Sequence, residues 1–215
     1  MKCKGAIFDM DGLMFDTERV YQQTWQELAD ERNIRLGDGF LKAISGTNGP
    51  YMCQVIKEYY HVSDGSFIVA ECMERIRKKL SVHVPVKEGV YEILAFFREK
   101  GIRTAVASSS SMEQIEANLK KVNMRGYFDA LVSGTEVENG KPAPDIFLYA
   151  AERIECLPNE CLVFEDSENG IRAGYAAGCI TVMVPDLIEP SPEILPCCSK
   201  ICRNLNQAMQ EIGNL

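Results

Sequence analysis

The chain has 215 residues, of which 46% are hydrophobic and 25% are charged, so it is long enough to bury a substantial core. Its formal net charge of −8 argues against a nucleic-acid-binding protein, because such proteins usually carry a basic face. No apolar run reaches the roughly 18 residues of a membrane helix, and no signal-peptide pattern precedes the first apolar segment. We therefore expect a cytoplasmic protein with no membrane association.

The cysteines form no recognisable metal or disulfide pattern. There are 9 of them, no Cys-x-x-Cys pair occurs, and the chain has 2 histidines. A zinc site is therefore disfavoured, and we expect reduced, mostly buried thiols as in a reducing cytoplasm. Nothing else in the sequence supports a redox role for the group Cys197, Cys198 and Cys202.

In chain order, the sequence predicts strands that alternate with helices. Short apolar runs predict strands at Gly5–Met10, Ile102–Ser108, Ala130–Ser133, Cys161–Phe164 and Ile180–Val184. Helical patterns lie at Val90–Glu99, Met112–Val122, Asp145–Arg153, Ser167–Ala177 and Asn204–Ile212. This alternation predicts an α/β fold, in which a Rossmann-like parallel sheet lies between two layers of helices.

Residues 17–82 break the alternation. They contain no clear strand and predict about four helices, with breaks near Leu36–Gly39, Ser45–Pro50 and Ser63–Gly65. We therefore expect two domains. Residues 1–16 and 83–215 would form the α/β core, and residues 17–82 would form a helical domain inserted after the first strand.

Two acidic residues follow the first strand directly, in the segment FDMDGLMFDT at residues 8–17. Side-chain direction repeats every two residues along a strand, so Asp9 and Asp11 point to the same side. Two carboxylates held that close repel each other unless a cation or a proton lies between them. The segment therefore predicts a magnesium site with a carboxylate nucleophile, and an acid-rich surface turn is the alternative.

A run of serines follows the strand that ends at Ser108. Hydroxyl and backbone N–H groups at a strand-to-helix turn suit an anion such as phosphate. Capping of the next helix is the alternative. Ser111, with Gln114 three residues further on, suits the capping role better. This leaves Ser108 and the amide of Ser109 for phosphate.

A lysine at the start of a predicted helix and two more acids at the end of a predicted strand are further candidates later in the chain. Lys141 lies in the segment GKPAPD, where two prolines fix the loop, although a lone lysine is usually a solvated surface charge. Glu165 and Asp166 follow the strand that ends at Phe164. A helix cap would explain one of these acids but not both. Because ligands bind beyond the carboxyl ends of parallel strands, these residues are candidates for one site.

These segments resemble the four motifs of the haloacid dehalogenase-like phosphohydrolases. The first motif, DxDGxxxDT, is matched by Asp9, Asp11, Gly12, Asp16 and Thr17. The other three are matched, in the family's order, by Ser108, by Lys141 in GKPAPD, and by Glu165 with Asp166. The resemblance extends from Asp9 to Gly178. It implies a helical cap that is inserted after the first motif and closes over the active site.

The resemblance also implies a role for each matched residue. Asp9 would be the nucleophile that forms an aspartyl-phosphate, and Asp11 would be the general acid and base. Ser108 would bind the transferring phosphoryl group, and Lys141 would neutralise the nucleophile and the phosphoryl oxygens. Gly12 would allow a close backbone approach and would belong, with Ser109, to the residues that bind the substrate's phosphate.

Magnesium is the implied cofactor. It takes about six oxygen ligands and usually only one or two protein carboxylates directly. Asp9, the backbone carbonyl of Asp11 and Asp166 could supply that set, with Glu165 bound directly or through water. The sequence therefore predicts a Mg²⁺-dependent phosphatase of a small phosphorylated metabolite, such as a sugar or nucleoside monophosphate. We expect a monomer.

A β-phosphoglucomutase is the main alternative. Within the family, the chain resembles a subgroup that contains β-phosphoglucomutases and small-metabolite phosphatases. The mutases of this subgroup carry an arginine in the first cap loop and a histidine in the helix after the first motif. Gly46 and Tyr21 stand at these positions here, which disfavours a mutase, although Lys42, Arg75 or Arg77 could replace the lost charge. A halide-releasing dehalogenase would leave the acidic set unexplained. A non-catalytic binding protein would have lost an essential residue.

Overall fold

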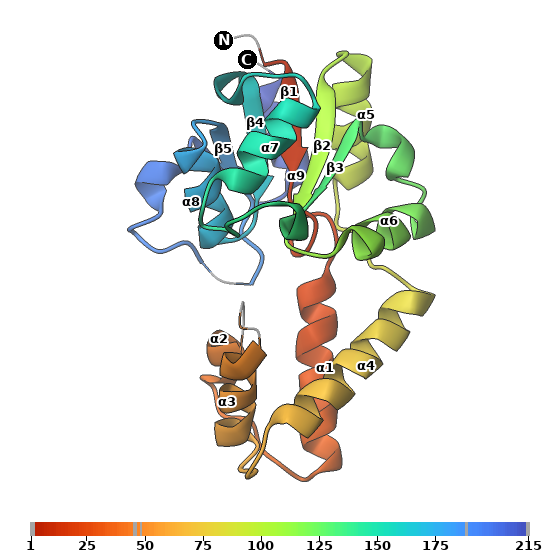
Figure 1. Cartoon of the computed structure of the whole chain (residues 1–215), viewed down its shortest axis with the longest axis vertical. Coiled ribbons are helices and arrows are strands. Elements are labelled where there is room, and N and C mark those ends of the chain that lie inside the picture. The colour runs from red at the N-terminus through yellow and green to blue at the C-terminus, as the bar shows by residue number, and fades with distance from the viewer. Residues whose placement is uncertain (1–2, 45–46, 48, 188, 214–215) are drawn as a thin grey trace. The chain divides into compact units, whose positions relative to one another are not determined.

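The computed structural model describes residues 3–44, 47, 49–187 and 189–213 (Figure 1). The chain divides into two compact units: Met1–Asp16 with Pro85–Leu215, which we call the core unit, and Thr17–Val84, the helical unit. The sequence placed the second boundary at residue 82. In the structure the helical unit extends to Val84, which is buried.

The core unit contains a parallel sheet in the order β3-β2-β1-β4-β5-β6. The strands are β1 Gly5–Phe8, β2 Arg103–Ser108, β3 Ala130–Ser133, β4 Cys161–Glu165, β5 Ile180–Met183 and β6 Lys200–Ile201. The predicted α/β class is confirmed, and the first five strands lie where the sequence placed them. Strand β6 was not predicted, because two exposed residues at a sheet edge carry no apolar pattern.

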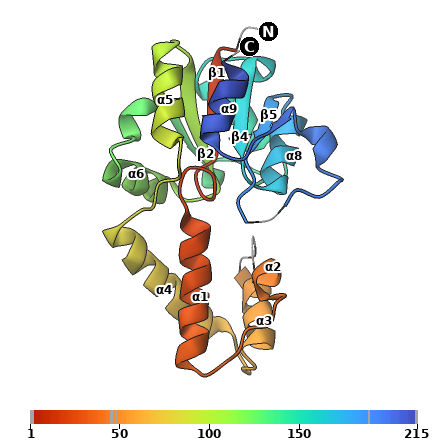
Figure 2. The ribbon, with the colours of Figure 1, turned by 180° about the vertical axis from the view of Figure 1, so that it is seen from behind.

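Helices cover both faces of this sheet. They are α5 Val90–Glu99, α6 Met112–Lys121, α7 Asp145–Arg153, α8 Glu168–Ala176 and α9 Leu205–Ile212, with short 3₁₀ turns at Arg125–Tyr127, Gly134–Glu136, Pro158–Glu160 and Leu195–Cys197. Helices α7 and α8 pack on one face, and α5 and α9 lie on the other (Figures 1 and 2). The predictions for α8 and α9 began one residue early, because they included Ser167 and Asn204. These two residues are the N-caps, whose side chains accept hydrogen bonds from the first helical turn.

Alternation along the central strands sorts their side chains between the two helical layers. Ile7 of β1 and Val163 of β4 pack in one buried cluster with residues of α7 and α8. Phe8 and Phe164 point to the opposite face, where their rings stack with centroids 4.7 Å apart and the ring of Phe97 from α5 lies against both. Side-chain direction repeats every two residues along a strand, so Asp9 and Glu165, two positions after Ile7 and Val163, lie on the α7 side of the sheet.

The helical unit consists of α1 Thr17–Glu31, α2 Phe40–Ile44, α3 Gly49–Tyr59 and α4 Ser66–Val82. Its core gathers around Trp25, Phe40 and Tyr60, and the Tyr60 hydroxyl donates to the backbone oxygen of Trp25 at 2.5 Å. Helix α1 ends before the predicted break near Leu36. Asn33 stops it by adopting a left-handed backbone, with φ of 55°. Within the described ranges, no helix is both long enough and apolar enough to cross a membrane.

The aromatic contact between β1, β4 and α5 is expected to carry much of the stability of the core unit. Phe8→Ala should lower the free energy of unfolding by about 3–5 kcal/mol, because it removes a fully buried ring and leaves a cavity. Urea denaturation followed by circular dichroism measures the change. Tyr175→Ala is the matched control, since that ring is 58% exposed and its loss should cost less than about 0.5 kcal/mol. Equal losses in the two variants would contradict this packing.

Candidate active site

The turn after β1 is fixed by backbone hydrogen bonds and by burial. The Asp9 amide donates to the Phe164 oxygen of β4 at 3.0 Å, and the Gly12 amide donates to the Phe15 oxygen at 2.9 Å. The apolar side chains of the turn, Met10, Leu13, Met14 and Phe15, are buried. Because these apolar side chains are buried and the turn follows β1, the carboxylates of Asp9 and Asp11 lie at the carboxyl edge of the sheet.

Lys141 lies at the centre of the site. Its ammonium group donates to Asp9 Oδ1 at 2.5 Å, to Glu165 Oε1 at 2.7 Å and to the backbone oxygen of Ala107 at 3.2 Å. Its side chain is 7% exposed, and the ring of Phe147 from α7 lies 5.0 Å from the nitrogen. An ammonium group has three donors, and these three acceptors match them. The carboxylates of Asp9 and Glu165 both lie on the α7 side of the sheet, because side chains alternate between its two faces. The loop that carries Lys141 leads into α7 on this same side.

The carboxylate of Glu165 has partners on both oxygens. Oε1 accepts from Lys141, and Oε2 accepts from the amide and the hydroxyl of Ser167 at 2.8 and 2.9 Å. Gly170 in the first turn of α8 makes room for this carboxylate, because a Cβ there would lie 1.7 Å from Oε1. Glu165 is therefore a buried, fully bonded acid that holds both Lys141 and the start of α8.

Gly12 makes room for the carboxylate of Asp166, as Gly170 does for that of Glu165. Its φ of +89° is a conformation that favours glycine, and a Cβ at this position would lie 2.2 Å from Asp166 Oδ2. The turn after β1 and the turn after β4 are thus in direct contact. The sequence predicted a close backbone approach at Gly12, and in the structure the group that lies close to this backbone is the Asp166 carboxylate.

One ligand oxygen from each of Asp9, Glu165 and Asp166 lies within 4.8 Å of the others. Burial raises the pKa of Asp9 to about 8, against the lowering effect of Lys141. Burial, together with the charges of Glu165 and Asp9, also raises the pKa of Asp166 well above its usual value. The cluster therefore holds more acid than one lysine neutralises. Hard oxygen donors with this excess of negative charge fit a magnesium ion.

The serine run after β2 meets the acidic turn. Ser108 Oγ lies 3.4 Å from Asp11 Oδ2, and Ser110 Oγ donates to the same oxygen at 2.8 Å. Ser109 is exposed on this turn, and Ser111 caps α6 by accepting from the Gln114 amide, as predicted. The sequence did not single out Ser110, because nothing distinguishes one member of a serine run from the next without the geometry.

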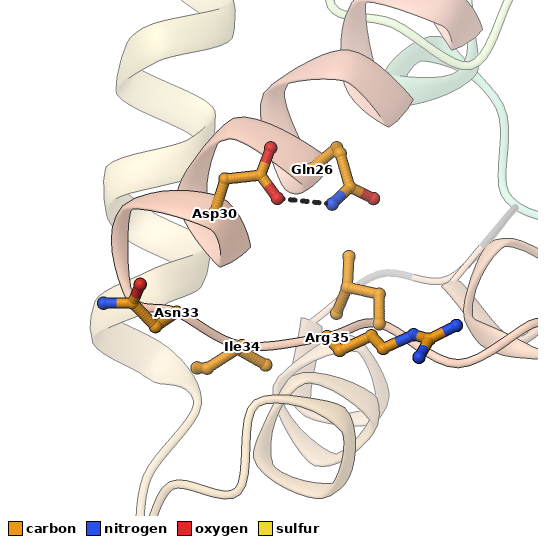
Figure 3. A pocket seen from close by; sticks show the side chains of 6 residues that line it. Gln26, Asp30, Asn33, Ile34 and Arg35 are labelled. Carbon is orange, nitrogen blue, oxygen red and sulfur yellow. Dashed lines mark hydrogen bonds between the residues drawn. The ribbon is translucent and has the colours of Figure 1, made fainter.

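The helical unit has an open cavity of its own, of about 530 Å³ (Figure 3). Its lining comes from the end of α1 and the segment that follows: Gln26, Asp30, Asn33, Ile34, Arg35 and Leu36. Figure 3 shows the hydrogen bond from Gln26 to Asp30, which is 2.8 Å long. This cavity contains none of the predicted site residues.

Comparison with known proteins relates the chain to haloacid dehalogenase-like hydrolases. The family model for haloacid dehalogenase-like hydrolases matches residues 6–184. A phosphorylated carbohydrates phosphatase from Thermotoga maritima is 30% identical over 176 residues, which cover 81% of this chain and 82% of that protein. A fructose-1-phosphate phosphatase from Escherichia coli is 33% identical over 181 residues, which cover 84% of this chain and 95% of the relative. A solved structure from T. maritima, provisionally assigned as a β-phosphoglucomutase, has a TM-score of 0.83 at 26% identity, with 100% of both chains covered.

The space beside Gly170 gives a first prediction for the site. Gly170→Ala should lower the free energy of unfolding by about 1–3 kcal/mol, because the added methyl group displaces a Glu165 carboxylate that is bonded on both sides. Gly126→Ala is the matched control, since no atom lies within 4 Å of a Cβ there. Urea denaturation of both variants tests the prediction, and an unchanged midpoint for Gly170→Ala would contradict the packing described.

The raised pKa of Asp9 gives a second prediction. Folded Asp9 keeps its proton up to about pH 8, whereas a carboxyl group with the ordinary pKa of 3.8 ionises earlier. The folded state therefore binds more protons in this window, so metal-free protein should lose stability as the pH rises through it. A divalent cation offsets the ionised charges. We expect MgCl₂ to raise the melting temperature more at pH 8 than at pH 6.

Thermal melts with chelator or with MgCl₂ measure this effect, and NaCl at matched ionic strength is the control. Asp9→Asn, which cannot ionise, should show a smaller fall in stability with pH and a smaller magnesium shift. A magnesium shift that is absent at both pH values would show that this cluster does not bind the ion, and a shift of equal size at pH 6 and pH 8 would show that binding is not coupled to the ionisation of Asp9.

Proposed function

Because the chain belongs to the haloacid dehalogenase-like hydrolases, we propose that it is a Mg²⁺-dependent phosphatase of small phosphorylated metabolites. The observation that carries the proposal is the buried ammonium of Lys141, bonded to Asp9 and Glu165. A surface lysine would not be paired in this way at the carboxyl edge of a parallel sheet. The phosphatases to which the chain is similar support the same reaction.

The proposed reaction has two steps. A carboxylate oxygen of Asp9 attacks phosphorus, and the bond from phosphorus to the ester oxygen breaks while Asp11 gives that oxygen a proton. The products are a free alcohol and an aspartyl-phosphate. Asp11 then takes a proton from a water molecule that attacks phosphorus, which releases inorganic phosphate and restores Asp9.

The surrounding residues would bind and orient the phosphoryl group. Lys141 holds Asp9 in place and would neutralise the phosphoryl oxygens, and the Ser108 hydroxyl and the Ser109 amide would donate hydrogen bonds to them. These groups are already held by the sheet and its turns. Little reorganisation would therefore be needed when the phosphate ester binds.

We assign the magnesium ligands to Asp9, the backbone carbonyl of Asp11 and Asp166. Glu165 already has a partner on each oxygen, so its proposed role is to hold Lys141 and Ser167 rather than to bind the ion directly. When bound, magnesium would supply positive charge that draws the phosphoryl oxygens toward Asp9 and offsets the charge that develops on them.

A phosphorylated carbohydrate is the proposed substrate class, with nucleoside monophosphates as the second choice. Two relatives are named for phosphorylated carbohydrates and for fructose 1-phosphate, and each covers more than four fifths of this chain. We propose that the helical unit is the cap domain of the enzyme and contributes to the choice of substrate.

The mutase alternative is supported by the solved structure at 26% identity that is provisionally assigned to that activity. A mutase needs a positively charged side chain that binds the second phosphate of its substrate. Two of the candidate side chains, those of Arg75 and Arg77, already form ion pairs with glutamates. Arg75 donates to Glu31 and Glu71 at 2.6–2.7 Å, and Arg77 pairs with Glu74. Gly46 and the side chain of Lys42 lie outside the part of the chain that the structure describes. These pairings favour the phosphatase.

Phosphorus NMR tests the proposed function. The purified protein is incubated with MgCl₂ and a panel of sugar and nucleoside monophosphates, and inorganic phosphate should appear with a sugar phosphate. Asp9→Asn should lower turnover at least ~10³-fold while the circular dichroism spectrum is unchanged, because an amide is a far weaker nucleophile. Asp38→Asn, which changes an exposed acid, should retain full activity.

The same panel contains β-glucose 1-phosphate with a trace of the 1,6-bisphosphate, as the test of a mutase. Conversion to glucose 6-phosphate with little free phosphate would replace the phosphatase proposal by the mutase. Normal phosphate release by Asp9→Asn would overturn the mechanism.

A further inference from the structure

Ser110 makes the shortest described contact from the serine run to the acidic turn, at 2.8 Å from its hydroxyl to Asp11 Oδ2. We infer that Ser110 is a positioning residue, whose hydroxyl sets the orientation of the Asp11 carboxylate for proton transfer to and from the substrate. This inference rests on the proposed role of Asp11 as the general acid and base.

The backbone of Ser110 is held independently of its hydroxyl. Its amide donates to Ser108 Oγ at 3.1 Å, and its carbonyl accepts from Ser133 Oγ at 2.7 Å. Ser133 is fixed in turn by a capping box with Glu136 at the end of β3. The hydroxyl of Ser110 is thus attached to a turn that two neighbouring strands hold in place, and it presents a fixed donor to Asp11.

An aspartate carboxylate can rotate about two side-chain torsions. A hydrogen bond to one oxygen restricts both torsions and so sets where the carboxylate faces. Proton transfer needs heavy atoms within about 2.6–3.2 Å of each other, and a displacement of about 1 Å can cost two orders of magnitude in rate. Ser108 reaches the same oxygen at only 3.4 Å, so it restrains Asp11 more weakly.

Two other roles for the Ser110 hydroxyl predict different behaviour. If it only supported the turn, its removal would change stability and affect all substrates alike. If it bound phosphate directly, its removal would weaken inhibition by inorganic phosphate and slow all phosphate esters alike. A residue that orients the general acid matters most when the leaving oxygen needs a proton, so the identity of the leaving group separates the three roles.

Ser110→Ala is the variant that tests the inference. It keeps the amide and carbonyl contacts with Ser108 and Ser133 and removes only the hydroxyl. The substrates are 4-nitrophenyl phosphate, whose leaving group departs without a proton, and the sugar phosphate that the NMR panel identifies. We expect kcat/KM for the sugar phosphate to fall by ~10-fold, a fraction of the full contribution of a general acid. The value for 4-nitrophenyl phosphate and the inhibition constant of inorganic phosphate should stay within about twofold.

Two further variants complete the design. Ser111→Ala removes the neighbouring hydroxyl, which caps α6, and it should alter stability but not the ratio of the two kcat/KM values. Ser110→Thr keeps a hydroxyl at the position and should recover most of the activity with the sugar phosphate.

The outcomes separate this inference from the proposed function. If the wild type hydrolyses both substrates and Ser110→Ala leaves the ratio unchanged, Ser110 does not position Asp11. Weaker inhibition by inorganic phosphate with an unchanged ratio would make Ser110 a phosphate ligand instead. If the wild type hydrolyses neither substrate in MgCl₂, the proposed function itself is wrong, and the role of Ser110 is overturned with it.

Discussion

The site depends on one buried ion pair, in which Lys141 holds Asp9 and Glu165. A buried ammonium group is strongly unfavourable unless carboxylates and hydrogen bonds compensate it, and removing one partner leaves an uncompensated charge. Its third acceptor is the backbone of Ala107. Because these partners come from three neighbouring strands, the ion pair fixes the ends of β2, β1 and β4 relative to one another. The contacts that join these three strand ends also set the position of the proposed nucleophile.

The second constraint is the room that the carboxylates of Glu165 and Asp166 need, and two glycines provide this room. Gly170 leaves room for the carboxylate of Glu165, and Gly12 lies against the carboxylate of Asp166. A side chain at either position would push an acid out of the cluster. The strands that carry the acids are joined on their other face by the stacked rings of Phe8 and Phe164. Burial first, and the neighbouring carboxylates second, raise the pKa of Asp9 and of Asp166.

Much of this arrangement could be predicted from the sequence, because apolar runs that end in acids or serines mark the carboxyl ends of buried parallel strands. The acids and serines gathered at the site belong to those ends, whereas Lys141 was singled out by the GKPAPD segment that leads into α7. Three features could not be predicted. The start of α1 was evident, but its end depends on the left-handed backbone of Asn33. Strand β6 exists only through pairing with β5. The contact of Ser110 with Asp11 depends on how two turns face each other, and a single sequence does not contain that distance.

The balance of charge explains why these residues would need a cation to act on phosphate esters. Four carboxylic acids, Asp9, Asp11, Glu165 and Asp166, share the carboxyl edge of the sheet with Lys141, which is bonded to two of them. A phosphate monoester brings further negative charge, so Lys141 alone cannot offset the repulsion. Protonation of the acids would reduce it, but a protonated Asp9 is a poor nucleophile. A divalent cation bound at the cluster would keep Asp9 ionised and attract the phosphoryl group at the same time, which is the role proposed for magnesium.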